Sequence, residues 1–155
     1  MDVVDKHTRS RMMAGIKAVN TKPEKYIRSW LHKIGLRFRL HAKNLPGKPD
    51  IVLSRYNVVI LVHGCFWHGH ECSIFKWPST RRDFWMKKIT DTRKRDLSNI
   101  AALHEAGWRV AVIWECETRK INAHREKVMK RLAMWIKGMS DVEFEKTRTK
   151  LNREG

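Results

Sequence analysis

Apolar residues near the start of this chain recur first at the spacing of an amphipathic helix and then at the spacing of a strand. The helical period ends at Gly35 and predicts a helix over 22–34. Glu24 follows Thr21 by three residues, which is the spacing of a capping box and supports this start. The apolar residues of the period are Ile27, Trp30, Leu31 and Ile34.

Four further stretches carry strand patterns. Apolar and basic residues alternate over 36–41, which predicts a half-buried strand. The continuous apolar runs 50–53, 58–63 and 109–114 predict buried strands. Because the connection 54–57 is so short, we expect the strands on either side of it to form an antiparallel hairpin.

Two longer stretches predict the remaining helices. The first covers 81–105, with Thr80 and Asp83 as its capping residues, and the second is a basic helix over about 123–137. The first of these helices joins the last two predicted strands, and a strand–helix–strand unit makes its strands parallel, in a right-handed crossover. We therefore predict an α/β fold, in which helices flank a small mixed β-sheet.

The net charge of the chain indicates what kind of partner it binds. Lys and Arg outnumber Asp and Glu by 33 to 16, which gives a net charge of +17 and a pI near 10.3. This excess indicates a polyanion such as DNA or RNA, although solubility charge or ribosome association would produce it too. The length of 155 residues predicts one folded domain, with a basic arm over 1–20 and a charged tail over 139–155.

Location follows from what the chain contains. No signal peptide opens it, and its longest apolar run is too short to span a bilayer. Three cysteines, an odd number lying near histidines, fit a reducing cytosol and a metal site better than disulfides. We expect a cytoplasmic protein with no membrane contact.

A group of metal-binding residue types follows the strand 58–63. Cys65, His70 and Cys72 lie close together in sequence, and Cys116 comes just after the strand 109–114. Because parallel strands end at the same edge of a sheet, Cys116 can complete the group. Three thiolates and one imidazole suit a closed tetrahedral Zn²⁺ site, which is structural rather than catalytic. The alternative is a set of ordinary buried thiols with incidental histidines.

A second group has the chemistry of a nuclease site. In a hairpin centred on its short loop, Asp50 lies diagonally across from His63 on the same face of the sheet. Asp50 and a backbone carbonyl near Val62 could hold Mg²⁺. His68 is a candidate general base for activating water, His63 could stabilise charge on phosphate, and Glu24 could act as a second acid or support the site.

Each of these residues also has a plain structural explanation. Glu24 is most often a helix cap, His63 a residue that ends a strand, and Asp50 a turn former. The combination is harder to explain structurally than its members are.

The same residues resemble a known family. Pro49-Asp50, the strand ending in His63-Gly-Cys-Phe-Trp-His68 and the later Trp114-Glu-Cys116 look like the very short patch repair (Vsr) mismatch endonucleases. That family is a restriction-endonuclease-like branch of the PD-(D/E)xK nucleases. The resemblance runs from about Lys6 to Trp135. It implies a bacterial, nucleoid-associated enzyme that nicks one DNA strand 5′ of the thymine in T·G mismatches, which arise by deamination of 5-methylcytosine.

The resemblance also implies a role for each matching residue. Asp50 would bind Mg²⁺, His63 and His68 would assist hydrolysis, and Glu24 would support the site. Cys65, His70, Cys72 and Cys116 would bind a structural zinc. Leu61 and His63 stand where the wider superfamily has its (D/E)xK acid and lysine, so metal binding would depend on backbone oxygen and phosphate.

Aromatic side chains beside this site predict how a mismatch is recognised. Phe66 and Trp67 flank a cysteine in a polar loop where little core is available, so we expect them to wedge between base steps. For Trp85 the residues alone favour core packing and intercalation equally. Met13 resembles the family residue that enters from the opposite groove.

Three hypotheses therefore stand. The first is a Mg²⁺-dependent mismatch-nicking endonuclease that contains structural zinc and acts as a monomer on double-stranded DNA, since one nick needs one active site. The second is a related nuclease with another DNA target. The third is a zinc-stabilised DNA-binding module without catalysis.

Overall fold

The computed structural model describes residues 20–119 and 122–139. Its four strands form one sheet in the order β1-β2-β3-β4. The first two pairs are antiparallel and the pair β3–β4 is parallel, so the predicted mixed sheet is confirmed. The strands are β1 (Arg39–Leu40), β2 (Ile51–Leu53), β3 (Val58–His63) and β4 (Arg109–Trp114).

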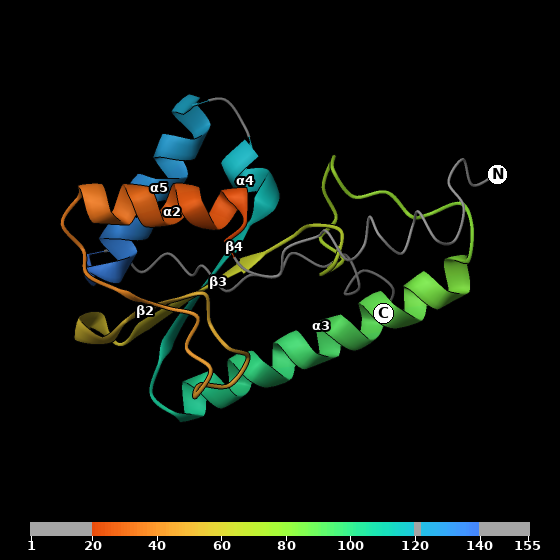
Figure 1. The fold of residues 1–155 in the computed structure, drawn as a ribbon, viewed down its shortest axis with the longest axis horizontal. Coiled ribbons are helices and arrows are strands. Elements are labelled where there is room, and N and C mark those ends of the chain that lie inside the picture. Colours follow the sequence, from red (N-terminus) through yellow and green to blue (C-terminus); the bar gives the residue numbers. More distant parts are fainter. Residues whose placement is uncertain (1–19, 120–121, 140–155) are drawn as a thin grey trace.

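Helices cover both faces of this sheet (Figure 1). The two longer helices on one face are α2 (Lys22–Lys33) and α5 (Asn122–Ile136), and α3 (Arg82–Glu105) lies along the other face. Strand side chains alternate between two cores: Ile60 packs in the core with α2 and α5, whereas Val59 packs in the core with α3. The predicted α/β architecture is therefore present in the part of the chain that the structure describes.

The register of the hairpin agrees with the prediction from its loop. Ile51 pairs with Ile60 and Val52 with Val59 across an antiparallel ladder. The connection contains a short 3₁₀ turn, η1 (Ser54–Tyr56), and ends at Asn57 in the left-handed region. Continuing the same register one and two residues further sets Asp50 opposite Leu61 and Pro49 opposite Val62.

Three local predictions differ from the structure. The strand expected over 36–41 is limited to β1, because His41 has a φ of 47° and ends the extended backbone. The expected capping of α3 by Thr80 and Asp83 is wrong, since the N-cap is Arg81 in a left-handed conformation without a side-chain capping bond. The unpredicted α4 (Glu115–Arg119) begins directly after β4 and contains Cys116.

The start of α2 confirms the capping prediction with one change. Thr21 is the N-cap, and its hydroxyl accepts a hydrogen bond of 3.4 Å from the N–H of Glu24. The Glu24 carboxylate, however, accepts from the N–H of Asn20, one residue before the N-cap, at 3.0 Å. Glu24 is thereby held at the sheet-facing side of α2, where only 2% of it is exposed.

In the described ranges, no helix has the combination of length and apolar character that crossing a membrane requires. Most of the predicted arm and tail, including Met13, lies outside the described residues.

Candidate active site and metal centre

The Pro-Asp pair at the start of β2 has a clear structural cause. Pro49 is opposite Val62 but has no N–H to donate to the Val62 carbonyl. The Val62 N–H instead donates to Asp50 Oδ2 at 2.7 Å, and the Pro49 carbonyl accepts from Ala42. The side chain of Asp50 therefore takes the place of a ladder bond, and this fixes its carboxylate at the rim of the sheet.

A second carboxylate and an imidazole lie beside Asp50. His41 Nε2 is 3.1 Å from Glu24 Oε2, and potential ligand atoms of Glu24, His41 and Asp50 all lie within 4.8 Å of one another. Burial, with a smaller contribution from the Glu24 charge, raises the pKa of Asp50 to about 7, although the Val62 hydrogen bond opposes this rise. The sequence analysis missed His41, because only its left-handed backbone brings it to this place.

The two predicted histidines are stacked. The rings of His63 and His68 are parallel within 1°, with centroids 3.8 Å apart. His63 is only 6% exposed, and burial lowers its pKa to about 3, so it is a neutral imidazole. Its Nδ1 is buried and has no hydrogen-bond partner among the described residues.

Asp96 of α3 completes the histidine pair. Its Oδ2 lies 2.6 Å from His68 Nδ1, which fixes the orientation of that ring. The sequence analysis missed Asp96, although a signal existed. Asp96 lies seven residues after Ile89 and four before Ile100, so it is a carboxylate on the buried face of the helix.

One pocket brings Asp50 together with the two histidines and Asp96, whereas Glu24 and His41 are not among the residues that line it. Its walls come from the loop before β2, the end of β3, the loop after β3 and the middle of α3. Gly47, with a φ of 71°, brings the first loop against α3, where an added Cβ would lie 2.9 Å from Asn99 Cβ. The predicted residues Asp50, Val62, His63 and His68 all line this pocket, together with Lys48 and Asp96.

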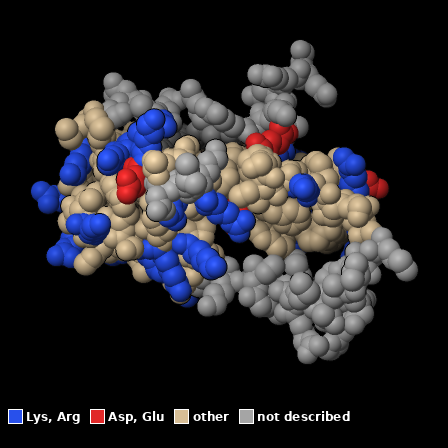
Figure 2. Space-filling model, turned by 90° about the horizontal axis from the view of Figure 1, so that it is seen from above, with Lys and Arg blue, Asp and Glu red and all other residues tan. Residues whose placement is uncertain are grey.

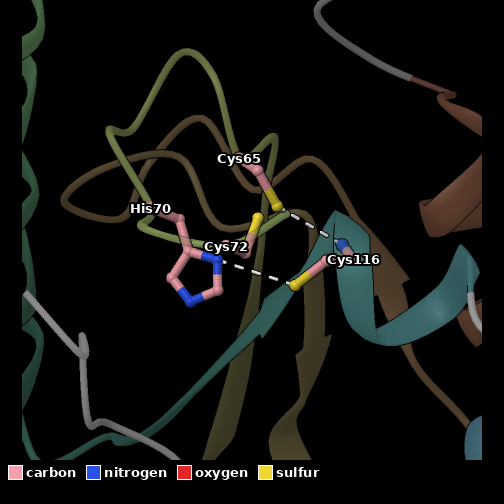
Figure 3. A group of neighbouring side chains, drawn as sticks. All are labelled: Cys65, His70, Cys72 and Cys116. Atoms are coloured by element: carbon pink, nitrogen blue, oxygen red, sulfur yellow. Dashed lines mark hydrogen bonds between the residues drawn. The ribbon is translucent and has the colours of Figure 1, made fainter. Parts of the chain in front are cut away.

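The four predicted metal ligands also come together (Figure 3). One potential ligand atom from each of Cys65, His70, Cys72 and Cys116 lies within 4.8 Å of the others. His70 presents Nδ1, at 3.6 Å from Cys116 Sγ, and its ring stacks on Trp114 with centroids 4.1 Å apart. Donors of a tetrahedral Zn²⁺ site are about 3.8 Å apart, so this group has the composition and approximate size of such a site.

The loop that contains these ligands packs against α3. Arg93 donates a hydrogen bond to the carbonyl of Gly69. Gly69 has a φ of 63°, and an added Cβ would lie 2.5 Å from Ile89 Cγ2. Only glycine fits here, so the contact between loop and helix depends on it.

An aromatic cluster lies beside the pocket. Phe66 and Trp67 are 5.2 Å apart, and both contact Trp85, at 5.4 and 6.0 Å between ring centroids. All three side chains are half-buried. The ammonium group of Lys88 lies 5.9 Å from the Trp67 ring. Three other tryptophans pack in the two cores: Trp30, Trp108 and Trp114.

The surface is basic, as the composition indicates. Lys and Arg dominate among the charged side chains on the face shown in Figure 2. Such a surface attracts a polyanion without selecting its sequence.

A mixed sheet carries an acid and two imidazoles at its rim, beside a Cys/His group that could hold a metal ion, and this combination of groups suits phosphodiester hydrolysis. Residues 1–74 match the family model of DNA mismatch endonuclease Vsr. The chain is 46% identical over 138 residues to DNA mismatch endonuclease Vsr of Escherichia coli, which covers 88% of each chain. It is 50% identical over 122 residues to the type II nicking enzyme V.XorIIP of Xanthomonas oryzae pv. oryzae, covering 79% of this chain and 90% of that enzyme. The chain belongs to the Vsr family, and it is an endonuclease.

Proposed function

We propose that this protein nicks one strand of double-stranded DNA on the 5′ side of the thymine in a T·G mismatch, in a Mg²⁺-dependent reaction. Such mismatches arise when 5-methylcytosine is deaminated, so the role is very short patch repair, on a restriction-endonuclease-like fold. The observation that carries the proposal is the pocket itself. It combines Asp50 with His63 and His68 directly beside the aromatic cluster.

Asp50 and Val62 fit the requirements of Mg²⁺. The ion prefers carboxylate and carbonyl oxygens with several waters, and it would polarise the phosphate and lower the pKa of water. The N–H and C=O of one strand residue point to the same side, so the Val62 carbonyl lies on the side of Asp50. Pro49 provides no N–H for that carbonyl, which leaves it available as a ligand.

In this proposal His68 accepts the proton of the attacking water, and its contact with Asp96 supports that role. Asp96 accepts a hydrogen bond from Nδ1–H, which selects the tautomer with a lone pair on Nε2. When Nε2 takes the proton, the Asp96 carboxylate stabilises the positive ring. The neutral His63 ring stacks on His68 and restricts its rotation, and His63 lines the pocket in which the phosphate would lie.

This arrangement predicts the effect of changing Asp96. We expect Asp96→Asn to lower the single-turnover nicking rate about 100-fold, because His68 loses its preferred tautomer and its charge partner. Asp91→Asn changes an exposed carboxylate on the same helix and should leave the rate unchanged. Nicking should be measured on a labelled T·G duplex. Equal rates for Asp96→Asn and the wild type would show that His68 is not the base, or that it needs no partner.

We also propose that Cys65, His70, Cys72 and Cys116 hold a structural Zn²⁺. All four ligand positions are filled by protein, which leaves none open for a reacting water. The ion would fasten the loop that contains Phe66, Trp67 and His68 to the start of α4. The zinc ion would therefore affect catalysis only indirectly, by holding these side chains in position.

The aromatic cluster provides the means of mismatch recognition. The wedge would consist of the flat rings of Phe66, Trp67 and Trp85, which contact one another. Lys88 lies next to these rings and could contact a phosphate. A mismatched step is weakly stacked, so opening it requires less free energy than opening a paired step. Met13 remains the expected contact from the opposite groove.

Phe66→Ala tests the wedge. We expect the dissociation constant for a T·G duplex to rise about tenfold, since stacking of one base on an aromatic ring contributes about 1–3 kcal/mol. Met134→Ala, an exposed apolar residue on α5, is the matched control. Fluorescence anisotropy with T·G and T·A duplexes measures the effect. If Phe66→Ala weakened both duplexes equally, the ring would serve general DNA binding rather than mismatch recognition.

A direct assay tests the proposed reaction. Duplexes that differ only in T·G or T·A at one position should be incubated with Mg²⁺, each strand carrying its own label. We expect one nick, in the thymine strand of the T·G duplex. Equal cutting of both duplexes would instead favour an enzyme with another DNA target.

A further inference from the structure

His41 is the residue near the pocket whose position most needs an explanation. It leaves β1 with a φ of 47°, in the left-handed region that histidine, asparagine and aspartate adopt more often than other residues with a side chain. Its backbone N–H donates to the Asp50 carbonyl at 3.0 Å, and its Nε2 lies 3.1 Å from Glu24 Oε2. His41 is therefore joined to Asp50 through the backbone and to the Glu24 carboxylate through its imidazole.

The two neighbouring carboxylates, Glu24 and Asp50, would be stabilised by a bound cation. Glu24 is almost fully buried, and Asp50 lies close enough for each carboxylate to raise the energy of the other's charge. Two buried carboxylates are stable as anions only when positive charge or several hydrogen bonds offset their repulsion. Asn20 and Val62 supply one backbone N–H to each, and His41 Nε2 contacts the same Glu24 oxygen that accepts from Asn20.

The separation of the donors matches a coordination shell. An octahedral ion about 2.1 Å from its ligands holds neighbouring ligand atoms about 3 Å apart. The distance of 3.1 Å between His41 Nε2 and Glu24 Oε2 is that of a hydrogen bond, and one potential ligand atom from each of Glu24, His41 and Asp50 lies within 4.8 Å of the others, close enough for one ion to contact all three. A shell with an imidazole nitrogen suits transition metals, whereas Mg²⁺ prefers oxygen alone.

We propose that Glu24, His41 and Asp50 form a binding site for a divalent transition metal, in which His41 Nε2 is a ligand and raises the affinity for Mn²⁺ relative to Mg²⁺. This site shares Asp50 with the proposed Mg²⁺ site and so rests on the proposed function. It adds a ligand and a metal preference that Asp50 and Val62 do not provide.

Pulsed electron paramagnetic resonance tests the nitrogen ligand directly. One equivalent of Mn²⁺ is added to the purified protein, and electron spin echo modulation from ¹⁴N is recorded. We expect imidazole nitrogen modulation in the wild type, its loss in His41→Asn, and its retention in His32→Asn, which changes an exposed histidine of α2. Asparagine suits the left-handed backbone at position 41, so this variant should fold. The Mn²⁺ dissociation constant should rise about tenfold in His41→Asn.

Two outcomes would overturn the proposal: a wild-type spectrum without nitrogen modulation, or a modulation of equal depth in His41→Asn. The wild-type spectrum decides the question even if the variant fails to fold. A failure here is separable from a failure of the proposed function, because nicking with Mg²⁺ is measured on the wild type and needs no nitrogen ligand.

Discussion

Asp50→Asn is expected to lower the nicking rate about a thousandfold or more, while duplex DNA is still bound. The carboxylate is the ligand through which the sheet would hold the divalent ion, and loss of several kcal/mol of transition-state stabilisation corresponds to this factor. Asparagine has nearly the same shape, and its side-chain oxygen can still accept from the Val62 N–H, so the fold should persist.

The measurement is single-turnover nicking of a T·G duplex, with anisotropy on the same duplex to report binding. Asp91→Asn is again the control for loss of a negative charge. If Asp50→Asn cut DNA within tenfold of the wild-type rate, Asp50 would not be the metal ligand.

The second large effect concerns the Cys/His centre. We expect Cys72→Ala to lose its zinc and about 3 kcal/mol or more of unfolding free energy, because binding of a structural ion contributes directly to folding. This corresponds to a melting temperature about 10 °C lower. Cys72 is half-buried, unlike Cys65 and Cys116, so its replacement leaves little cavity to confuse the result.

Metal content by mass spectrometry and thermal melting test this prediction. Ser73→Ala is the matched control, since it changes an exposed neighbour in the same loop. One zinc per chain is expected in the wild type and in the control. A wild type that folds without metal and melts together with Cys72→Ala would refute the structural role of zinc.

The sequence was sufficient for those parts of the site that depend on strand register. The short hairpin connection determined that Asp50 is opposite Leu61, and the parallel pair brought Cys116 to the loop of Cys65. Both inferences rest on the fixed geometry of a β-ladder, in which counting residues gives position. The helix α2 could be predicted equally well, because its capping residues and its apolar period indicate the same start.

Residues that enter the site from outside the ladder could not be placed in this way. Asp96 reaches His68 only because of the angle at which α3 crosses the sheet, and His41 reaches Glu24 only because of a left-handed backbone. Neither angle follows from residue spacing. The capping of α3 also escaped prediction, since its N-cap, Arg81, makes no side-chain hydrogen bond, although the predicted start of the helix is within one residue.

Leu61 explains how this chain differs from the wider nuclease pattern. By its resemblance to that pattern, Leu61 would stand where the pattern has an acid, and it is 5% exposed and packs in the core with α3. A carboxylate there would have to be buried in an apolar environment, at considerable free-energy cost. In the proposed site the Val62 carbonyl would supply the oxygen ligand without burial of a further charge.

The most direct test of the central claim is the metal dependence of single-turnover nicking by the wild type. A T·G duplex labelled on both strands is incubated with the protein in excess, first in EDTA and then after addition of Mg²⁺. We expect an intact duplex in EDTA, because brief chelation removes the ion at Asp50 but not the zinc, and a nick in the thymine strand alone once Mg²⁺ is present. Equally fast nicking in EDTA would contradict a reaction that depends on a cation held by Asp50.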